Sequence, residues 1–105
     1  MLVDLIGYAH TPFGKLPGAD VEALMREVST TAIGDAHLDA NEIDAVVVGH
    51  FNPGFVRQGF TAGLSAGLLP GLHMVPAVRV ENACATGSAA IHHAQALIAS
   101  GQARH

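Results

Sequence analysis

The stretch VENACATGSAA, residues 80–90, contains the single cysteine of the chain, Cys84. A valine-rich run over 75–80 leads into it, and a long row of small and apolar residues over 85–100 leads out of it. This order predicts that Cys84 lies where a strand ends and a helix begins. The first N–H groups of a helix point out of its N-terminus and carry partial positive charge. They favour a thiolate there, and they can hold an oxyanion that develops on a substrate carbonyl.

Strand and helix patterns alternate outward from this stretch. Strands are expected over 2–6, over Ala45–Val48 and over Val75–Val80, with Pro76 favouring the start or edge of the third. Helices are expected over 21–33 after an Asp20 N-cap, over 60–69, and from Cys84 to Ser100, with an Asp39–Glu42 capping box on a brief turn between the first two. Glycines 59, 63 and 67 recur at every fourth position and indicate helix packing rather than a phosphate loop.

The alternation predicts an α/β fold with a mostly parallel sheet and helices on its faces. Sites in such sheets form beyond the carboxyl ends of the strands, which is where Cys84 is expected. The last helix is apolar most of the way round and should be buried on several sides. A chain of 105 residues has little material after residue 100 to bury it, so we expect an N-terminal piece of a larger protein or dependence on a partner.

Composition narrows the function classes. Half of the residues are hydrophobic, 13% are charged, and the net charge is −4. Five Lys and Arg residues form no basic patch, which argues against nucleic acid or anionic lipid as a partner. No apolar run reaches the roughly 18 residues of a membrane span, and we expect no signal peptide at the N-terminus. One cysteine makes no internal disulfide, so a reducing, cytoplasmic location is expected.

Three segments resemble one known family. The run 82–88, followed by an alanine-rich helix, resembles the nucleophile segment of thiolases. Residues 11–14 resemble the Arg-Thr-Pro-x-Gly loop of that family, with His10 in place of the arginine, and 38–49 resemble its turn into the second strand. The resemblance covers 1–105 without a gap. It is greatest to the sterol-carrier-protein-like thiolases and to the acetyl-CoA acetyltransferases of bacteria and archaea.

The resemblance implies that 1–105 is part of a thiolase N-terminal domain, its first three strand–helix units, without the C-terminal half. Cys84 would then take an acyl group from acyl-CoA as a thioester, for thiolytic cleavage or Claisen condensation. In the family a histidine and a second cysteine in later motifs assist, and neither a Gly-His-Pro motif nor a second cysteine occurs here. The isolated chain is therefore expected to be inactive, because a general base must lie within hydrogen-bond reach.

The resemblance also implies how the whole protein works and assembles. CoA thioesters are the substrates, and no further cofactor is expected. A homodimer or homotetramer is implied, with Val75–Val80 at the dimer contact, and some relatives bind a small zinc-ribbon, OB-fold protein. The alternative is a non-catalytic fragment or interaction module that uses its apolar helix as a partner surface.

For several of these residues, an ordinary structural role is an alternative to a chemical one. Cys84 could be a plain buried thiol. Asn82 could shape the turn or line the site, Thr86 and Ser88 are expected to hydrogen-bond locally at the helix start, and Gly87 to permit close approach. Arg57 and Arg79 could meet a CoA phosphate or serve at a surface or interface. The seven histidines show no metal-binding spacing, so no metal site is predicted.

Overall fold

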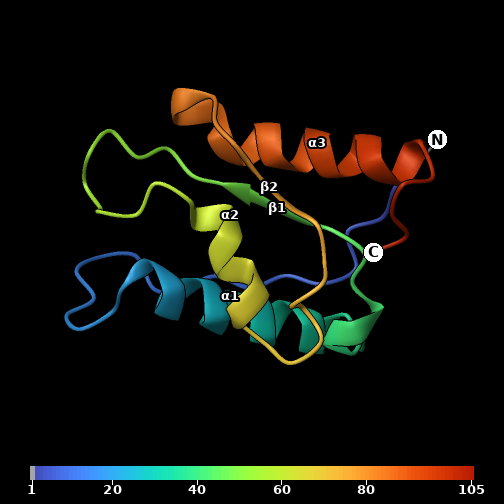
Figure 1. Cartoon of the computed structure of the whole chain (residues 1–105), viewed down its shortest axis with the longest axis horizontal. Coiled ribbons are helices and arrows are strands. Elements are labelled where there is room, and N and C mark those ends of the chain that lie inside the picture. The colour runs from blue at the N-terminus through green and yellow to red at the C-terminus, as the bar shows by residue number, and fades with distance from the viewer. Residues whose placement is uncertain (1) are drawn as a thin grey trace.

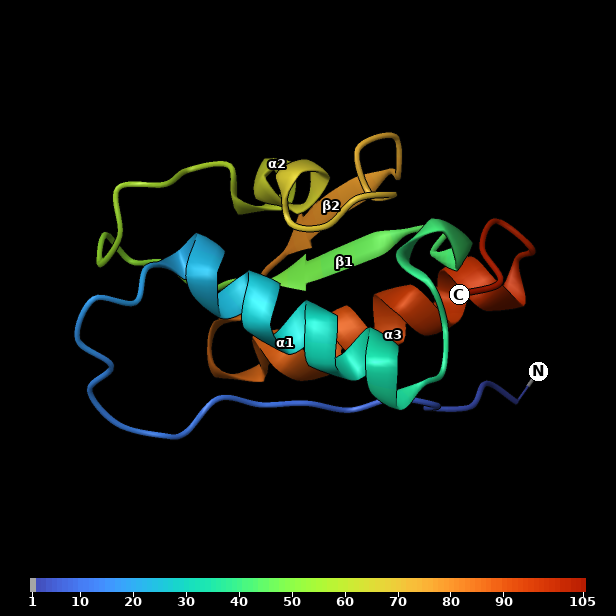
Figure 2. The ribbon, with the colours of Figure 1, turned by 90° about the horizontal axis from the view of Figure 1, so that it is seen from below.

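The computed structural model describes residues 2–105, and its centre is a parallel pair of strands. Strand β1 (Val46–Gly49) pairs with β2 (Ala77–Val80) in a register that places Val46 opposite Ala77. Helix α3 (Thr86–Ala99) lies on one face of this sheet, and α1 (Val21–Asp35) and α2 (Thr61–Leu64) lie on the other (Figures 1 and 2). The predicted α/β architecture with a parallel sheet is confirmed.

The strand boundaries follow from the sequence. Four consecutive small or β-branched positions form β1, and the strand ends before the loop that starts at His50. Strand β2 begins directly after Pro76, whose carbonyl accepts a hydrogen bond from the Val46 N–H at 2.9 Å. Proline has no N–H to offer a ladder, so it stands at the entrance of the strand and not inside it. The prediction of a start position for Pro76 is confirmed.

The predicted strand over 2–6 is wrong, because this segment pairs with neither β1 nor β2 in the described chain. It runs beside α3, where Val3 and Leu5 line a groove with Ile91 and Ile98. At its end the Tyr8 N–H donates to the Asp35 carboxylate of α1 at 2.9 Å, rather than to β1. Without a backbone partner, alternating apolar residues give an extended segment but no sheet.

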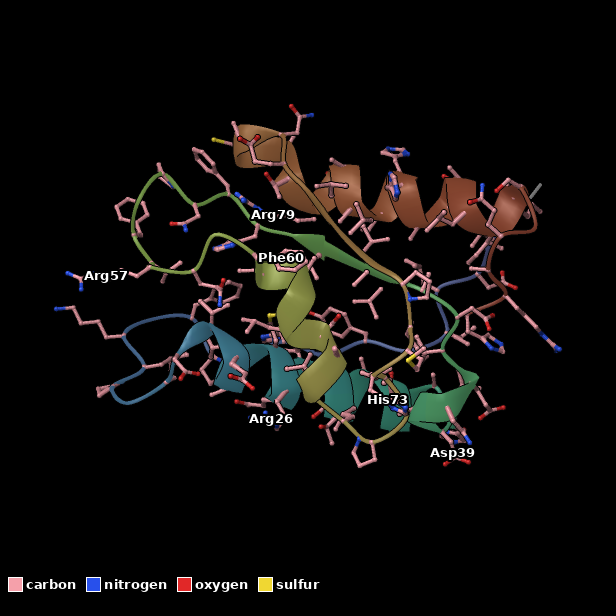
Figure 3. The ribbon with its side chains drawn as sticks, viewed as in Figure 1. Arg26, Asp39, Arg57, Phe60, His73 and Arg79 are labelled. Carbon is pink, nitrogen blue, oxygen red and sulfur yellow. The ribbon has the colours of Figure 1, made fainter. Side chains whose placement is uncertain are left out.

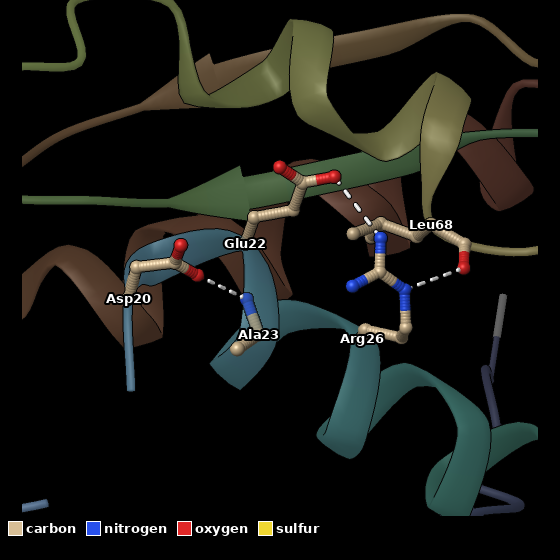
Figure 4. Close-up of polar contacts among 5 residues, drawn as sticks. All are labelled: Asp20, Glu22, Ala23, Arg26 and Leu68. Atoms are coloured by element: carbon tan, nitrogen blue, oxygen red, sulfur yellow. Dashed lines mark hydrogen bonds and ion pairs between the residues drawn. The ribbon is translucent and has the colours of Figure 1, made fainter. Parts of the chain in front are cut away.

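Helix α1 is the most completely specified element. The Asp20 side chain accepts a hydrogen bond from the Ala23 N–H at 2.7 Å, as its N-cap position predicts. One turn later, the Arg26 guanidinium pairs with Glu22 at 3.0 Å and donates to the Leu68 carbonyl at 3.2 Å (Figure 4). The second bond connects α1 to the segment that follows α2. The predicted Asp39–Glu42 turn is also present, as a 3-10 helix over Ala40–Glu42.

The predicted helix over 60–69 is shorter and less regular than expected. Its α-helical part is α2, and a 3-10 turn over Ser65–Gly67 follows. The expected helix packing through glycines is wrong: a Cβ at 59 or 67 would meet nothing within 4 Å in the described chain, and the three atoms nearest to a Cβ at Gly63 belong to the Phe60 ring. Glycine in a helix interior lowers helix stability relative to alanine. This agrees with the change from α-helix to a 3-10 turn after Leu64.

The buried residues cluster around α2. Ala62, Leu68 and Leu72 are buried with Thr61 and Ser65. By contrast, the only buried residue of α3 is Thr86, and Ile91 is 55% exposed. Within residues 2–105 the sheet covers only one side of α3, as expected for a chain with little material after residue 100 to bury this helix. No helix within 2–105 is long and apolar enough to cross a membrane.

Candidate active site

Cys84 lies in a short turn between the end of β2 and the start of α3. The turn is a 3-10 helix over Ala83–Ala85, and regular α-helix begins at Thr86, two residues later than predicted. The predicted order of strand, cysteine and helix is confirmed. The alternative of a buried thiol is wrong, since the Cys84 side chain is exposed.

The Thr86 side chain is the main polar link within this turn. Its hydroxyl accepts a hydrogen bond from the Asn82 N–H at 2.9 Å and donates one to the Ala83 carbonyl at 2.6 Å. Thr86 is only 7% exposed, so water has little access to these bonds. The prediction that Thr86 is a local hydrogen-bonding residue is confirmed. Asn82 shapes the turn through its backbone, because its carbonyl also accepts from the Ala85 N–H at 2.9 Å.

Ala83, the residue before the cysteine, has an unusual backbone conformation. Its φ of 45° lies in the left-handed region, which costs a residue with a Cβ about 1–2 kcal/mol. Two contacts oppose this cost: the Glu81 carboxylate accepts the Ala83 N–H at 2.6 Å, and Thr86 holds the Ala83 carbonyl. Strained backbone of this kind recurs at functional sites, where the surrounding structure maintains it.

The backbone donors at the start of α3 are only partly used. The Thr86 N–H bonds to the Ala83 carbonyl, whereas the Cys84 N–H has no hydrogen-bond partner within residues 2–105. No side chain caps the helix at Ala85. An N–H beside the thiol is therefore available to a ligand, and it is suited to an anionic oxygen.

Gly49 sets how closely α3 approaches the sheet, and the sequence reasoning missed it. A Cβ at this position would lie 3.1 Å from the Thr86 carbonyl oxygen and 3.2 Å from both Thr86 Cγ2 and the Ala90 side chain. At Gly87, where close approach was expected, nothing lies within 4 Å of such an atom in the described chain. A signal for Gly49 was present in the sequence, where a glycine directly follows the three valines of a predicted strand.

The two arginines considered as phosphate contacts lie in different surroundings. Arg79 donates from Nε to the His50 carbonyl at 3.0 Å and so links the carboxyl ends of β1 and β2. Arg57 is exposed on the loop after β1 and extends outward (Figure 3). It lines a groove with Asp20 and Glu22, whose carboxylates would repel a phosphate. A structural role for Arg79 and a surface role for Arg57 agree with these positions.

No histidine is brought into hydrogen-bond contact with the Cys84 thiol within the described part of the chain. His50 lies at the carboxyl end of β1, but its Nδ1 faces the Thr61 hydroxyl at 3.3 Å. His10 lies in the N-terminal loop and stacks between Tyr8 and Phe13. Over residues 2–105 no three side chains of the metal-binding types gather at one place. The site therefore consists of an exposed thiol and a free backbone N–H, and no histidine contacts the thiol among residues 2–105.

Comparison of the sequence with known proteins identifies the family of this chain. The family model for the thiolase N-terminal domain matches residues 3–105. An acetyl-CoA acetyltransferase of Methanocaldococcus jannaschii is 40% identical over 100 residues, and one of Methanothermobacter thermautotrophicus is 35% identical over 103. A non-specific lipid-transfer protein-like 2 of Caenorhabditis elegans is 31% identical over 102 residues.

These matches cover nearly all of this chain but a small part of each relative. Each alignment takes in 94% of the chain, and 24–26% of the relative. The chain thus spans about a quarter of the length of the curated relatives it matches. Since the family model accounts for all but the first two residues, the chain belongs to the thiolase family, and its match is to the family's N-terminal domain.

Proposed function

We propose that this chain supplies the acyl-accepting cysteine of an acyl-CoA acyltransferase of the thiolase class. The observation that carries the proposal is the turn at Cys84, where an exposed thiol stands beside its own unpartnered N–H at the start of α3. Acyl transfer requires a nucleophile and an oxyanion donor close together, and one residue carries both here.

The first half-reaction is a transthioesterification. The Cys84 sulfur attacks the thioester carbonyl carbon of acyl-CoA, and the carbonyl oxygen takes up negative charge that the Cys84 N–H stabilises. The carbon–sulfur bond to CoA then breaks, and CoA leaves as a thiol with the proton that Cys84 gave up. In the condensing direction, a second acyl-CoA loses an α-proton and the resulting carbanion attacks the acyl-cysteine. The carbon–sulfur bond to Cys84 breaks, 3-ketoacyl-CoA leaves, and the proton returns to the Cys84 sulfur. Thiolytic cleavage of a 3-ketoacyl-CoA is the reverse.

The base for these proton transfers is proposed to come from outside residues 1–105. No imidazole touches the thiol within 2–105, and a base must lie within hydrogen-bond reach of the proton it removes. We accordingly propose that 1–105 is part of an N-terminal domain, the rest of which supplies a histidine and a second cysteine. The isolated chain should then show no turnover.

Two archaeal relatives are named acetyl-CoA acetyltransferases, which supports acetyl-CoA as the acyl donor. We further propose that CoA thioesters suffice as reactants without a resident cofactor. The whole protein should assemble as a homodimer or homotetramer in the cytoplasm, with the exposed edge around Val78 at the contact. A small zinc-ribbon, OB-fold protein is a further candidate partner.

Mass spectrometry of the protein from its source, after incubation with acetyl-CoA, tests the proposal. The expected result is one added acetyl group that maps to Cys84 and that hydroxylamine removes. The Cys84→Ala variant should take up none, and Ser88→Ala, a change four residues further on, should be acetylated normally. Absence of the acetyl group from the unaltered protein, or its presence on another residue, would contradict the proposal.

An interaction module is the second candidate, because several large apolar side chains remain exposed within 2–105. They include Leu2, Leu5, Phe13 and Ile91, at 98%, 83%, 96% and 55% exposure. This function predicts a Cys84 that stays unmodified while the chain copurifies with a partner that covers α3. The acetylation experiment therefore separates the two candidates.

A further inference from the structure

We infer that Thr86 is a positioning residue for Cys84, which it holds in the geometry for acylation through its hydroxyl and not through its methyl group. The inference rests on the proposed function of Cys84, and it goes beyond that function by assigning the residue that fixes the reactive turn. Its basis is a pair of hydrogen bonds that one buried side chain makes on either side of the backbone leading to the cysteine.

The Thr86 hydroxyl uses both its acceptor and its donor capacity inside one turn. Asn82 supplies the N–H, and Ala83 supplies the carbonyl, so the two residues before Cys84 are held together from the helix side. Thr86 itself is 7% exposed and both of its hydrogen bonds are partly buried, so loss of the hydroxyl would leave one N–H and one carbonyl of the turn without their protein partner. Each lost hydrogen bond removes some of the stabilisation of this conformation, and the turn would rearrange so that the two groups bond to water or to other partners.

The conformation that these bonds maintain is one the backbone would not adopt unaided. Ala83 has a φ of 45°, and no side chain caps the helix at Ala85. A relaxed turn would move Ala83 into an ordinary conformation and redirect both the Cys84 thiol and its free N–H. Acyl transfer requires these two groups to meet one carbonyl, so a displacement on the order of 1 Å is sufficient to slow it about 100-fold.

The two halves of the Thr86 side chain have separable roles. The methyl group, Cγ2, packs over Gly49 at the end of β1, whereas the hydroxyl bonds only to the turn. Thr86→Val keeps the shape and the packing but removes both hydrogen bonds. Thr86→Ser keeps the hydroxyl and removes the packing. The two variants therefore distinguish positioning of the cysteine from support of the fold.

The test measures the single-turnover rate of Cys84 acetylation at varied acetyl-CoA concentration in the complete protein. Thr86→Val should lower the maximal rate by about 10- to 100-fold and leave the half-saturating concentration within about twofold, as expected for lost orientation. Thr86→Ser should retain the rate within about threefold, although its midpoint of thermal unfolding falls. Equal rates for Thr86→Val and the unaltered protein, or an equal loss in both variants, would overturn the inference.

Amide hydrogen exchange provides a second test, which depends neither on acetylation nor on the folding of a variant. In the unaltered protein the Asn82 N–H, held by Thr86, should exchange at least about tenfold more slowly than the unpartnered Cys84 N–H. Comparable exchange at the two amides would show that the hydroxyl does not hold the turn. If Cys84 were not acetylated while the Asn82 N–H still exchanged slowly, the proposed function would be wrong. The two hydrogen bonds of Thr86 would then stand as a structural property of the turn.

Discussion

The two long helices of this chain begin in opposite ways. Helix α1 starts behind Asp20, whose carboxylate accepts a hydrogen bond from the free Ala23 N–H at 2.7 Å. Helix α3 starts behind a 3-10 turn with no capping side chain, and the N–H next to its first turn remains unpartnered within 2–105. Capped starts are the common solution because free N–H groups are costly. An uncapped start next to an exposed cysteine leaves those donors for a substrate.

The surroundings of the two starts differ in the same sense. The α1 start is followed by an ion pair between Glu22 and Arg26 on an ordinary amphipathic helix. The α3 start carries a residue in the left-handed region, a buried hydroxyl that ties the turn, and a glycine pressed against it from β1. The comparison shows where this fold stabilises a helix end locally, and where it keeps one strained and open.

Of the changes that alter the difference between the two helix starts, adding a methyl group at Gly49 should have the largest effect. Gly49→Ala would place a Cβ within 3.1–3.2 Å of Thr86 and Ala90, so the α3 start must move. We expect a loss of about 2 kcal/mol in the free energy of unfolding, as for other overpacked contacts, with slower acetylation of Cys84. Chemical denaturation and the acetylation rate are the measurements.

Gly34, near the end of α1, is the matched control. A Cβ there meets nothing within 4 Å, so Gly34→Ala should stabilise the protein by about 0.5–1 kcal/mol by favouring the helix. If the alanine at 49 proved as well tolerated as that at 34, the close approach of α3 to β1 would not govern the reactive turn.

A negative charge at the open helix start should have the next largest effect. In Ala85→Asp a carboxylate would stand beside Cys84, where it opposes negative charge on the sulfur and on the substrate oxygen. We expect acetylation of Cys84 to slow by about tenfold at neutral pH, equivalent to about 1.4 kcal/mol. The neutral variant Ala85→Asn should react within about threefold of the unaltered protein. A common loss in both would point to side-chain bulk, and would remove the electrostatic role of the open start.

Removal of the α1 cap should change stability alone. Asp20→Ala leaves the Ala23 N–H without its 2.7 Å partner and should cost about 1 kcal/mol of folding free energy. Asp20→Ser should recover most of this loss, because a serine hydroxyl also caps. Neither change should alter the acetylation rate of Cys84. A drop in that rate in the alanine variant would mean that the two helix starts are coupled.

The sequence predicted where α3 starts better than it predicted the residues that hold this start in place. The valine runs, the Asp20 cap and the position of Cys84 are local patterns, and the structure confirms them. Gly49 was missed because its role depends on a helix almost 40 positions away. The strand predicted over 2–6 failed for the same reason: a strand needs a partner edge, which a local pattern does not supply. The role of Cys84 in catalysis remains a prediction.

The carboxylate of Asp44 holds the other end of α3, so this end differs from the open start of the same helix. It accepts hydrogen bonds from the Arg104 N–H at 2.8 Å and from the His105 N–H at 3.2 Å, so it connects the chain after α3 to the segment just before β1. These two backbone hydrogen bonds, the Arg104 one first, lower the pKa of Asp44 below its ordinary value of 3.8. The stabilisation they give is therefore fully present above that value and disappears as pH falls through the lower pKa of the folded state.

The Arg104 and His105 amide chemical shifts should consequently titrate together at a pH below 3.8. In Asp44→Asn the side chain still accepts a hydrogen bond but no longer ionises, so this transition should disappear while the remaining acid titrations persist. The effect on stability should be the smallest of the four, because Asp44 is exposed and water screens its charge. A midpoint at or above 3.8 for these amides would show that the tie to residues 104–105 is not formed in solution. The anchored end of α3 would then be as open as its reactive start.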